Sequence, residues 1–269
     1  MISIIMPVYN SSKYVKYAIE SVLNQSYHNW ELIIINDGST DQSENIILSY
    51  DDLRIKYYVQ NNLGVSAARN LALKYMKGLF FCFLDSDDVL PSNSLQSRIN
   101  IFNQNPDISF VDGVVLIKDY KMDTILRYFR PSFKGNPYNK LIQISERCFF
   151  GPSWMIKRNS DIKYIFNPNM THLEDLYFYL SISENGIYDY TNDPILYYRT
   201  TSTSSMSNLS GLEGGYYKYF NLVKNFHKYD YSTILYLKYK ICRIMFSIYI
   251  FDKNNPKKAF SILMKYLFM

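Results

Sequence analysis

The sequence is poor in cysteine and histidine, with three of each among its 269 residues. The cysteines are too few for a disulfide framework and lack the paired spacing of a zinc site, which is typical of proteins from a reducing cytosol. The histidines form no metal-binding motif either. We therefore expect neither a disulfide-stabilised fold nor a structural zinc site.

Long hydrophobic runs are also missing. No stretch reaches the roughly 18 uncharged apolar residues that a membrane-spanning helix requires. The apolar residues 2–6 are too few for a signal peptide and have no basic flank. These two absences predict a cytoplasmic protein without a transmembrane helix.

The positive charge is concentrated at the end of the chain. Residues 216–269 hold ten Lys and Arg against two acids, a net charge of +8, whereas the remainder has 19 against 22, a net charge of −3. No nucleic-acid-binding motif accompanies the basic segment, so we do not expect a nucleic-acid partner. With 48% hydrophobic residues, the chain is long enough for one large domain, or for one domain with an appendage.

A run of six apolar residues, 79–84, is followed directly by Asp85, Asp87 and Asp88. The absence of alternation predicts a strand buried on both faces, as in a parallel α/β sheet. Such sheets bind ligands at the carboxyl ends of their strands, and hard carboxylate oxygens suit Mg²⁺ or Mn²⁺ shared with substrate phosphates. The alternative interpretation is an acidic turn that caps the next helix.

The first half of the chain alternates strand and helix patterns, which predicts a doubly wound α/β layer. Strands are expected at residues 2–6, 32–35, 54–59 and 79–84. Helices are expected at residues 14–23, capped by Ser11 or Ser12, at 67–77, capped by Ser66 and ended by Gly78, and from Ser92 onward.

The second half is less regular. Strands are expected at residues 108–111, 114–117, 154–156 and 195–198, whereas residues 118–150 give no clear pattern. A helix over residues 176–184 would place Asp175 near its positive end, which favours the ionised carboxylate. Residues 211–215 are interpreted as a glycine hinge.

The chain then ends in two basic, apolar segments. Their polar stripes consist of Lys240, Arg243 and Ser247 in residues 234–251, and of Lys258, Ser261 and Lys265 after Pro256. A basic stripe on an apolar helix is typical of a membrane-surface anchor, which predicts peripheral contact with the inner face of the cell membrane. The alternative is a helix packed on the domain or on a homodimer partner.

Several ordered motifs together resemble the family 2 glycosyltransferases, inverting enzymes of the GT-A fold that use nucleotide-diphosphate sugars. The resemblance runs from Ser3 to about Ser207. It is carried by residues 3–10 (SIIMPVYN), 21–26 (SVLNQS), 34–41 (IINDGSTD), 64–70 (GVSAARN), 84–88 (LDSDD) and Glu174-Asp175 followed by Phe178. A DxD triplet alone is common, but the order and spacing of the whole set are specific.

The resemblance implies a GT-A domain over residues 1–207 and a helical extension over 208–269. Residues 1–112 would form the nucleotide-sugar half and 113–207 the acceptor half. The fold would be α/β, with a mostly parallel central sheet flanked by helices and a C-terminal helical appendage.

It also implies roles for individual residues. At the donor, Tyr9 would stack on uracil beside Pro7, and Asp37 would accept the base N3–H. The remaining implied roles are Arg69 at the base or diphosphate, Asp85 at the ribose, Asp87 at Mn²⁺ or Mg²⁺, Arg199 at the diphosphate, Asp175 as general base and Glu174 orienting the acceptor or base. Many relatives have a histidine where Thr201 stands, so the hydroxyl-rich residues 201–205 either bind phosphate in its place or form a lid.

The function implied is transfer of a hexose or N-acetylhexosamine from a UDP-sugar to a glycan or lipid-linked oligosaccharide acceptor. Bacterial surface polysaccharides such as O-antigen, capsule or lipopolysaccharide core are the implied products. Two alternatives are a non-catalytic nucleotide-sugar or glycan-binding module and a nucleotidyltransferase. The latter would need a Gly-rich phosphate loop after the first strand, where Pro7-Val8-Tyr9-Asn10 stands instead.

Overall fold

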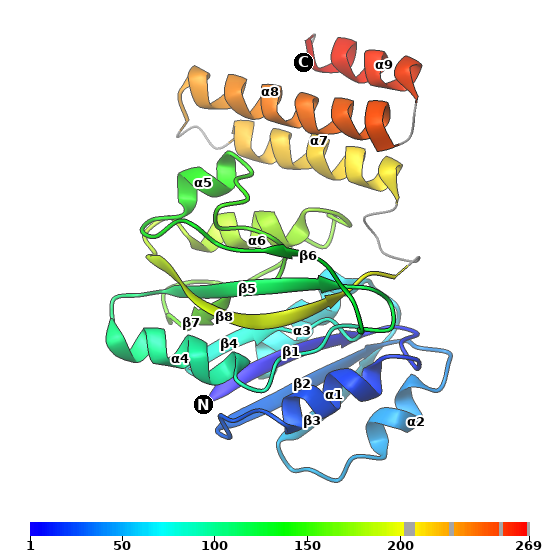
Figure 1. Cartoon of the computed structure of the whole chain (residues 1–269), viewed down its shortest axis with the longest axis vertical. Helices are drawn as coiled ribbons and strands as arrows, with labels where there is room; N and C mark the ends of the chain where they lie inside the picture. The colour runs from blue at the N-terminus through cyan, green and yellow to red at the C-terminus, as the bar shows by residue number, and fades with distance from the viewer. Residues whose placement is uncertain (202–207, 226–228, 253–254, 268–269) are drawn as a thin grey trace.

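An eight-stranded sheet forms the centre of the computed structural model, which describes residues 1–201, 208–225, 229–252 and 255–267 (Figure 1). Four parallel neighbours form one half in the order β3 (Ile55–Gln60), β2 (Trp30–Asp37), β1 (Ile2–Val8) and β4 (Phe80–Phe83). The other half contains β7 (Met155–Lys157), β5 (Phe110–Lys118), β6 (Ile125–Phe129) and β8 (Tyr188–Arg199). Only β6 and β7 run against the other strands, so the predicted α/β class with a mostly parallel sheet is confirmed.

Both faces of this sheet are covered, which explains why its central strands are continuously apolar. In β2, Ile33 and Ile35 join one buried cluster, and Leu32 and Ile34 join the other. One face carries α1 (Val15–Leu23), α2 (Ser43–Leu48) and α4 (Ser94–Gln104). The other carries α3 (Val65–Tyr75), α5 (Tyr138–Ile142) and α6 (Glu174–Ile182).

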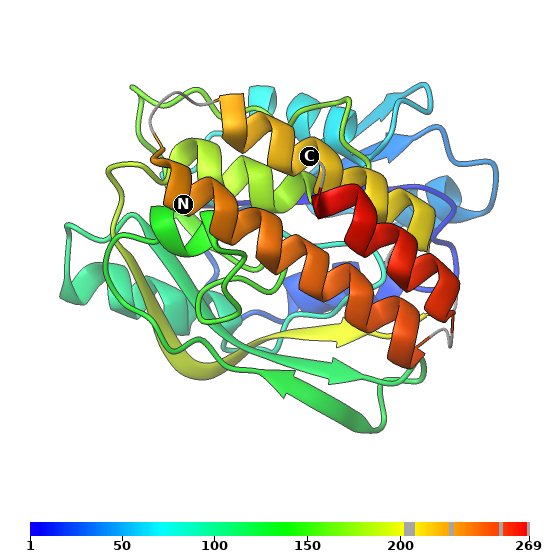
Figure 2. The ribbon, with the colours of Figure 1, turned by 90° about the horizontal axis from the view of Figure 1, so that it is seen from above.

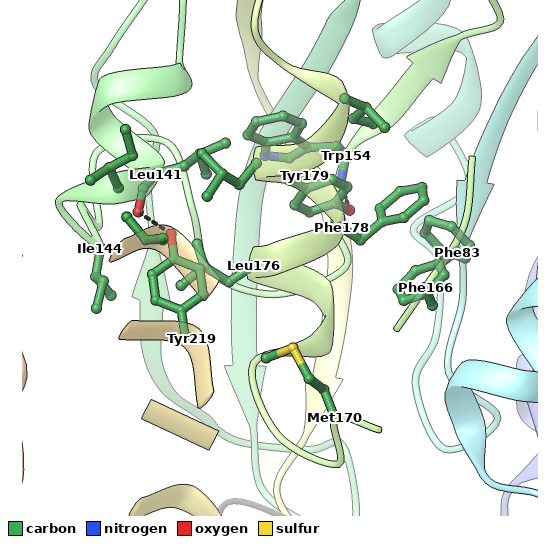
Figure 3. Packing of buried hydrophobic residues seen from close by; sticks show 14 of the residues in the cluster. Phe83, Leu141, Ile144, Trp154, Phe166, Met170, Leu176, Phe178, Tyr179 and Tyr219 are labelled. Carbon is green, nitrogen blue, oxygen red and sulfur yellow. Dashed lines mark hydrogen bonds between the residues drawn. The ribbon is translucent and has the colours of Figure 1, made fainter. Parts of the chain in front are cut away.

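Aromatic residues fill the core around α6 (Figure 3). Tyr179 stacks on Trp154 with ring centroids 4.2 Å apart, and Phe178 stacks on Phe166 at 4.1 Å. Tyr179 also accepts a hydrogen bond at its hydroxyl from the Trp154 backbone N–H. These contacts pack α6 against Trp154, just before β7, and against Phe166 in the segment between β7 and α6.

The C-terminal helices α7 (Leu209–Asn225), α8 (Tyr231–Ser247) and α9 (Pro256–Leu267) lie in a layer above α5 and α6 (Figures 1 and 2). A short π-helix, η2 (Ile248–Asp252), extends α8. Buried side chains of all three helices belong to the same cluster as α6, and Tyr219 of α7 donates to the Leu141 carbonyl. The predicted helical appendage is confirmed. None of the helices in the described ranges is both long and apolar enough to cross a membrane.

Three predicted helix caps, two at N-termini and one at a C-terminus, are wrong. The N-cap of α1 is Tyr14 without a side-chain hydrogen bond, while Ser11 contributes only its carbonyl. Ser66 lies inside α3, which follows Gly64 with φ of 88°. Gly78 does not end this helix, because α3 stops at Tyr75. A Cβ on Gly78 would lie 2.6 Å from the Ser3 backbone nitrogen, so close strand packing explains this glycine.

The two strands predicted at residues 108–111 and 114–117 are one strand, β5. Its register shifts between Asp112 and Val114, which places a bulge at Gly113. A Cβ on Gly113 would lie 2.5 Å from Ile195 of β8, so the bulge needs a glycine. The segment predicted at residues 195–198 is part of the longer β8, and residues 118–150, which gave no pattern, contain β6 and α5.

The glycine hinge is also wrong, since residues 211–215 lie within α7. A Cβ would lie 2.2 Å from the His172 ring at Gly211 and 2.7 Å from the His172 Cβ at Gly215. These two glycines therefore let the α7 backbone approach the segment that leads into α6. At Gly214, by contrast, no atom lies within 4 Å of an added Cβ.

Candidate active site

Asp85, Asp87 and Asp88 lie at the carboxyl end of β4, as the sequence predicted. Asp88 is only 3% exposed, and its carboxylate accepts a 2.8 Å hydrogen bond from the Arg199 backbone N–H. Burial, followed by the charges of Asp87 and Asp85, raises its pKa well above the usual value. Asp88 thus links the acidic turn after β4 to the end of β8. The sequence did not reveal this contact.

Asp87 is partly exposed, and burial together with the Asp85 charge raises its pKa to about 6. A bound cation would relieve this repulsion, so the two carboxylates fit Mg²⁺ or Mn²⁺ chemically. Within the described ranges, no three His, Cys, Asp or Glu side chains converge on one metal position. Such an ion would therefore take its other ligands from water and from substrate phosphates, as Mg²⁺ commonly does.

Arg69 lies buried between the two halves of the site. Its Nη2 donates to Asp85 Oδ1 at 2.9 Å, and its Nη1 donates to Glu174 Oε1 at 3.2 Å. The guanidinium carbon also lies 5.2 Å from the centroid of the Phe166 ring. The family resemblance implied that Arg69 contacts the base or diphosphate of the nucleotide sugar. No pattern in the sequence indicated its two carboxylate partners.

The first turn of α6 holds Glu174 and Asp175. The helix begins earlier than predicted, after Leu173 in the left-handed region with φ of 59°. A non-glycine residue in this region is strained, and such strain clusters at functional sites. The Asp175 carboxylate accepts a 2.7 Å hydrogen bond from the Leu176 N–H.

The electrostatic prediction for Asp175 is wrong. The positive helix end was expected to favour the ionised carboxylate, yet burial and the neighbouring Glu174 charge raise its pKa. Arg69 acts in the opposite direction without cancelling these effects. Asp175 is therefore a better proton acceptor than an ordinary aspartate.

Tyr9, Pro7 and Asp37 lie at the ends of the adjacent strands β1 and β2. Pro7 is the second-last residue of β1, and Tyr9, just beyond it, is 50% exposed. The Asp37 carboxylate accepts hydrogen bonds from Gln60 Nε2 and from the N–H groups of Leu63 and Gly64. Asp37 thus holds the loop that leads into α3, a role that its turn motif did not indicate.

The Arg199 side chain points to the α1 side of the β4 turn. Its Nε donates to the Asp87 carbonyl at 2.7 Å, and its Nη1 donates to the Tyr120 carbonyl at 2.6 Å. Its guanidinium carbon lies 4.9 Å from the centroid of the Tyr14 ring. Of the hydroxyl-rich stretch 201–205, residues 202–205 lie outside the described residues.

The structure thus gathers the predicted residues along one edge of the sheet, where β2, β1 and β4 end. The donor-side residues Pro7, Tyr9, Asp37, Asp85 and Asp87 come from these strand ends. Arg69 of α3 connects them to Glu174 and Asp175 of α6. An arrangement of this kind can hold an anionic ligand over the strand ends and a proton acceptor beside it.

Comparison with known proteins identifies relatives of this architecture. Glycosyl transferase family 2 matches residues 3–165. The Escherichia coli protein UDP-Glc:alpha-D-GlcNAc-diphosphoundecaprenol beta-1,3-glucosyltransferase WfgD is 36% identical over 187 residues, which cover 69% of this chain and 71% of that protein. An uncharacterized glycosyltransferase of Rickettsia typhi is 36% identical over 191 residues, 66% of this chain and 58% of its own length. The match spans still less, 23%, of a longer Rickettsia felis relative.

Solved structures show the same fold. Staphylococcus aureus TarS 1–349 in complex with UDP-GlcNAc gives a TM-score of 0.69 at 20% identity, covering 97% of this chain and 75% of TarS 1–349. The mannosyltransferase PcManGT of Pyrobaculum calidifontis, in complex with GDP-Man and Mn²⁺, gives 0.66 at 16% identity, covering 98% and 74%. The fold is therefore GT-A with C-terminal helices. Since the family match alone covers more than half of the sequence and reaches from β1 past β7, the chain belongs to glycosyl transferase family 2.

Proposed function

We propose that the protein transfers a hexose or N-acetylhexosamine from a UDP-sugar to a hydroxyl of a glycan or lipid-linked glycan acceptor, with inversion, in bacterial surface polysaccharide synthesis. The observation that carries this proposal is that the buried Arg69 pairs with Asp85, of the same acidic turn as Asp87, and with Glu174, the neighbour of Asp175. A binding module needs no base of this kind. The name of the E. coli relative supports a UDP-sugar and a diphosphate-linked lipid acceptor.

Asp175 acts as the general base. Its raised pKa suits a group that takes the acceptor proton near neutral pH. The deprotonating oxygen attacks the anomeric carbon from the face opposite UDP, so an α-linked donor gives a β-linked product. Glu174 orients Asp175 or the acceptor, and is itself held by Arg69.

Asp87 would hold Mn²⁺ or Mg²⁺, and such an ion would neutralise negative charge on the diphosphate leaving group. Asp85 binds the ribose at its exposed edge, while its Oδ1 remains paired with Arg69. Arg69 then acts on the donor through Asp85. Arg199 contacts the diphosphate from the α1 side of the turn.

The nucleotide base stacks on the exposed Tyr9 beside Pro7. Asp37 already accepts three hydrogen bonds, and a carboxylate offers about four acceptor positions. One position on Oδ2 therefore serves the uracil N3–H, a donor that cytosine lacks. Guanine also carries a ring N–H, so GDP belongs in the test.

We divide the chain as the sequence suggested, into a nucleotide-sugar half (1–112), an acceptor half (113–207) and a helical extension (208–269). The extension binds the membrane surface through α8. Tyr236, Tyr239 and Phe246 are 45%, 62% and 36% exposed, and their spacing with Arg243 places them on one helix face. The α9 half of the expected stripe contributes less, because Lys258 and Lys265 pair with Glu213 of α7.

Sedimentation with vesicles separates this anchor from its alternative. Tyr239→Ser with Arg243→Ser should reduce binding to vesicles rich in anionic lipid, and Lys258→Ser should change it little. Equal loss in both variants would contradict the α8 surface. A concentration-dependent dimer disrupted by the α8 variant would instead identify this face as a homodimer contact.

The enzymatic proposal is tested by UDP release from several UDP-sugars in the presence of lipid-diphosphate sugar acceptors. Steady release that needs the acceptor is expected, with little from GDP- or CDP-sugars. Binding of a UDP-sugar without turnover for any acceptor would favour the non-catalytic module. Preferential use of a GDP-sugar would overturn the donor assignment.

A further inference from the structure

A pocket lies beside the candidate active site, on the α1 face of the sheet. Its volume is about 710 Å³. Its walls are α1, the residues that follow Asp88, the connection between β5 and β6, and the end of β8. Of its lining residues, only Arg199 has a role implied by the family resemblance.

The pocket is strongly basic. Its lining contains four cations, Lys13, Lys118, Lys121 and Arg199, against one carboxylate, Glu20. Lys13 and Lys121 are exposed, so their ammonium groups can turn toward a ligand. A pocket lined mainly by one sign of charge attracts ligands of the opposite sign.

Two of these cations are held in place by the protein. Lys118 Nζ donates to the Met122 carbonyl at 3.0 Å and lies 4.4 Å from the centroid of the Tyr197 ring. Arg199 is fixed by the carbonyls of Asp87 and Tyr120. The pocket therefore offers partly preorganised positive charge, which reduces the ordering cost of binding.

Tyrosines alternate with these cations. Tyr14 and Tyr17 line the α1 side, and Tyr120 and Tyr197 line the opposite side. Tyr17 and Tyr120 are 55% and 59% exposed. Their rings offer apolar faces and hydroxyl groups to the same ligand, which suits a sugar ring with its C–H faces and hydroxyls.

The pocket adjoins the donor site through the backbone. Arg199 Nε donates to the carbonyl of Asp87, the proposed metal ligand. Val89, two residues further, exchanges backbone hydrogen bonds with Tyr197 at 3.1 and 2.8 Å. A ligand in this pocket would lie next to the turn that holds the donor diphosphate.

We propose that this pocket binds the diphosphate and first sugar of a lipid-linked acceptor. This inference rests on the proposed glycosyl transfer. The donor diphosphate has the same chemistry, but the proposal assigns it to Asp87 and its metal ion. The acceptor diphosphate is then the second anion, which Lys13, Lys118 and Lys121 can bind.

The test uses direct binding, without turnover. With UDP and Mg²⁺ saturating the donor site, calorimetry compares a decyl-linked N-acetylglucosaminyl diphosphate with decyl N-acetylglucosaminide, which lacks phosphates. We expect the diphosphate probe to bind about tenfold more tightly. Lys13→Ala with Lys121→Ala should weaken it about fivefold or more and leave the phosphate-free probe unchanged.

Lys74→Ala with Lys77→Ala is the matched control, because it removes the same charge from exposed positions near the end of α3. Tyr17→Ala should weaken the sugar diphosphate probe but not inorganic pyrophosphate. Unchanged probe affinity in the Lys13 and Lys121 variant, or an equal loss in the control, would overturn the proposal. A loss of UDP affinity instead would assign the pocket to the donor. Since the assay needs no reaction, binding without transfer would contradict only the proposed function.

Discussion

Arg69 of α3 donates to Glu174 of α6 across 3.2 Å, in an ion pair that joins the two sides of the candidate active site. The Arg69 side chain is 3% exposed, and its second carboxylate partner is Asp85. A buried guanidinium requires such compensation, because an unpaired charge in the interior is costly. The site is therefore assembled around one buried cation with two acidic partners.

Removing this cation should destabilise the protein. We expect Arg69→Met to lower the free energy of unfolding by about 3–5 kcal/mol, because Asp85 and Glu174 lose their shared partner. Arg54→Met is the comparison, since Arg54 and Asp52 form a more exposed pair that should contribute about 1 kcal/mol or less. Urea unfolding measures both. Equal losses of unfolding free energy in the two variants would show that the buried ion pairs of Arg69 contribute no more than the exposed pair of Arg54.

Asp175→Asn should remove the base without removing the donor site. Asparagine keeps the size of the side chain but cannot accept a proton at neutral pH. Transfer should fall by about a hundredfold or more, while UDP affinity changes little. UDP release and calorimetry measure the two quantities. Near-normal turnover here, with loss in Glu174→Gln, would exchange the two roles.

Asp87→Asn should affect donor binding and turnover together. The amide cannot replace the carboxylate charge that would hold Mn²⁺ or Mg²⁺, so metal-dependent UDP binding should weaken about tenfold or more. Turnover should also be lost, and chelation should stop the unmodified enzyme. Full activity after exhaustive chelation would contradict the metal requirement. Thermal unfolding checks that the variant remains folded.

Neighbouring glycines of α7 should respond in opposite ways to alanine. Gly215→Ala places a methyl group 2.7 Å from the His172 Cβ, so overpacking should cost about 1–3 kcal/mol. At Gly214 no atom lies within 4 Å of the new Cβ, so Gly214→Ala should stabilise the helix by about 0.5–1 kcal/mol. Chemical denaturation of both variants tests this. Stabilisation of both would show that α7 does not pack closely on His172.

The buried Asp112 should make stability depend on pH. Burial raises its pKa to about 6, although the Gly113 N–H and the Tyr188 hydroxyl donate to it. The unfolded carboxyl ionises at lower pH, so this group lowers stability progressively between about pH 4 and pH 6, and the penalty is constant above that range. Asp112→Asn should abolish this contribution. Relative to the unmodified protein, the variant should gain up to about 3 kcal/mol between pH 4 and pH 7. If the free energies of unfolding of the variant and the unmodified protein change in parallel with pH, the raised pKa of Asp112 would be contradicted.

The sequence determined the sheet and the location of the site. The apolar runs of β1, β2 and β4 are local signals, because a strand covered on both faces needs apolar side chains at successive positions. The polar residues that follow each run then lie at one edge of a parallel sheet. This reasoning placed Asp37, Asp85 and Asp87 correctly at the strand ends.

Other features depend on neighbours distant in the chain and were decided only by the tertiary structure. Arg69 and Glu174 meet across 105 positions of sequence, and no local pattern encodes such a pair. The glycines at 78, 211 and 215 look like caps or hinges in the sequence, but they are needed because Ser3 or His172 packs against them. The pKa of Asp175 also depends on the tertiary structure. Burial and the adjoining Glu174 charge raise it, and they outweigh the lowering that the sequence predicted from the positive helix end. Desolvation depends on what covers a group, and that is known only when the chain has folded.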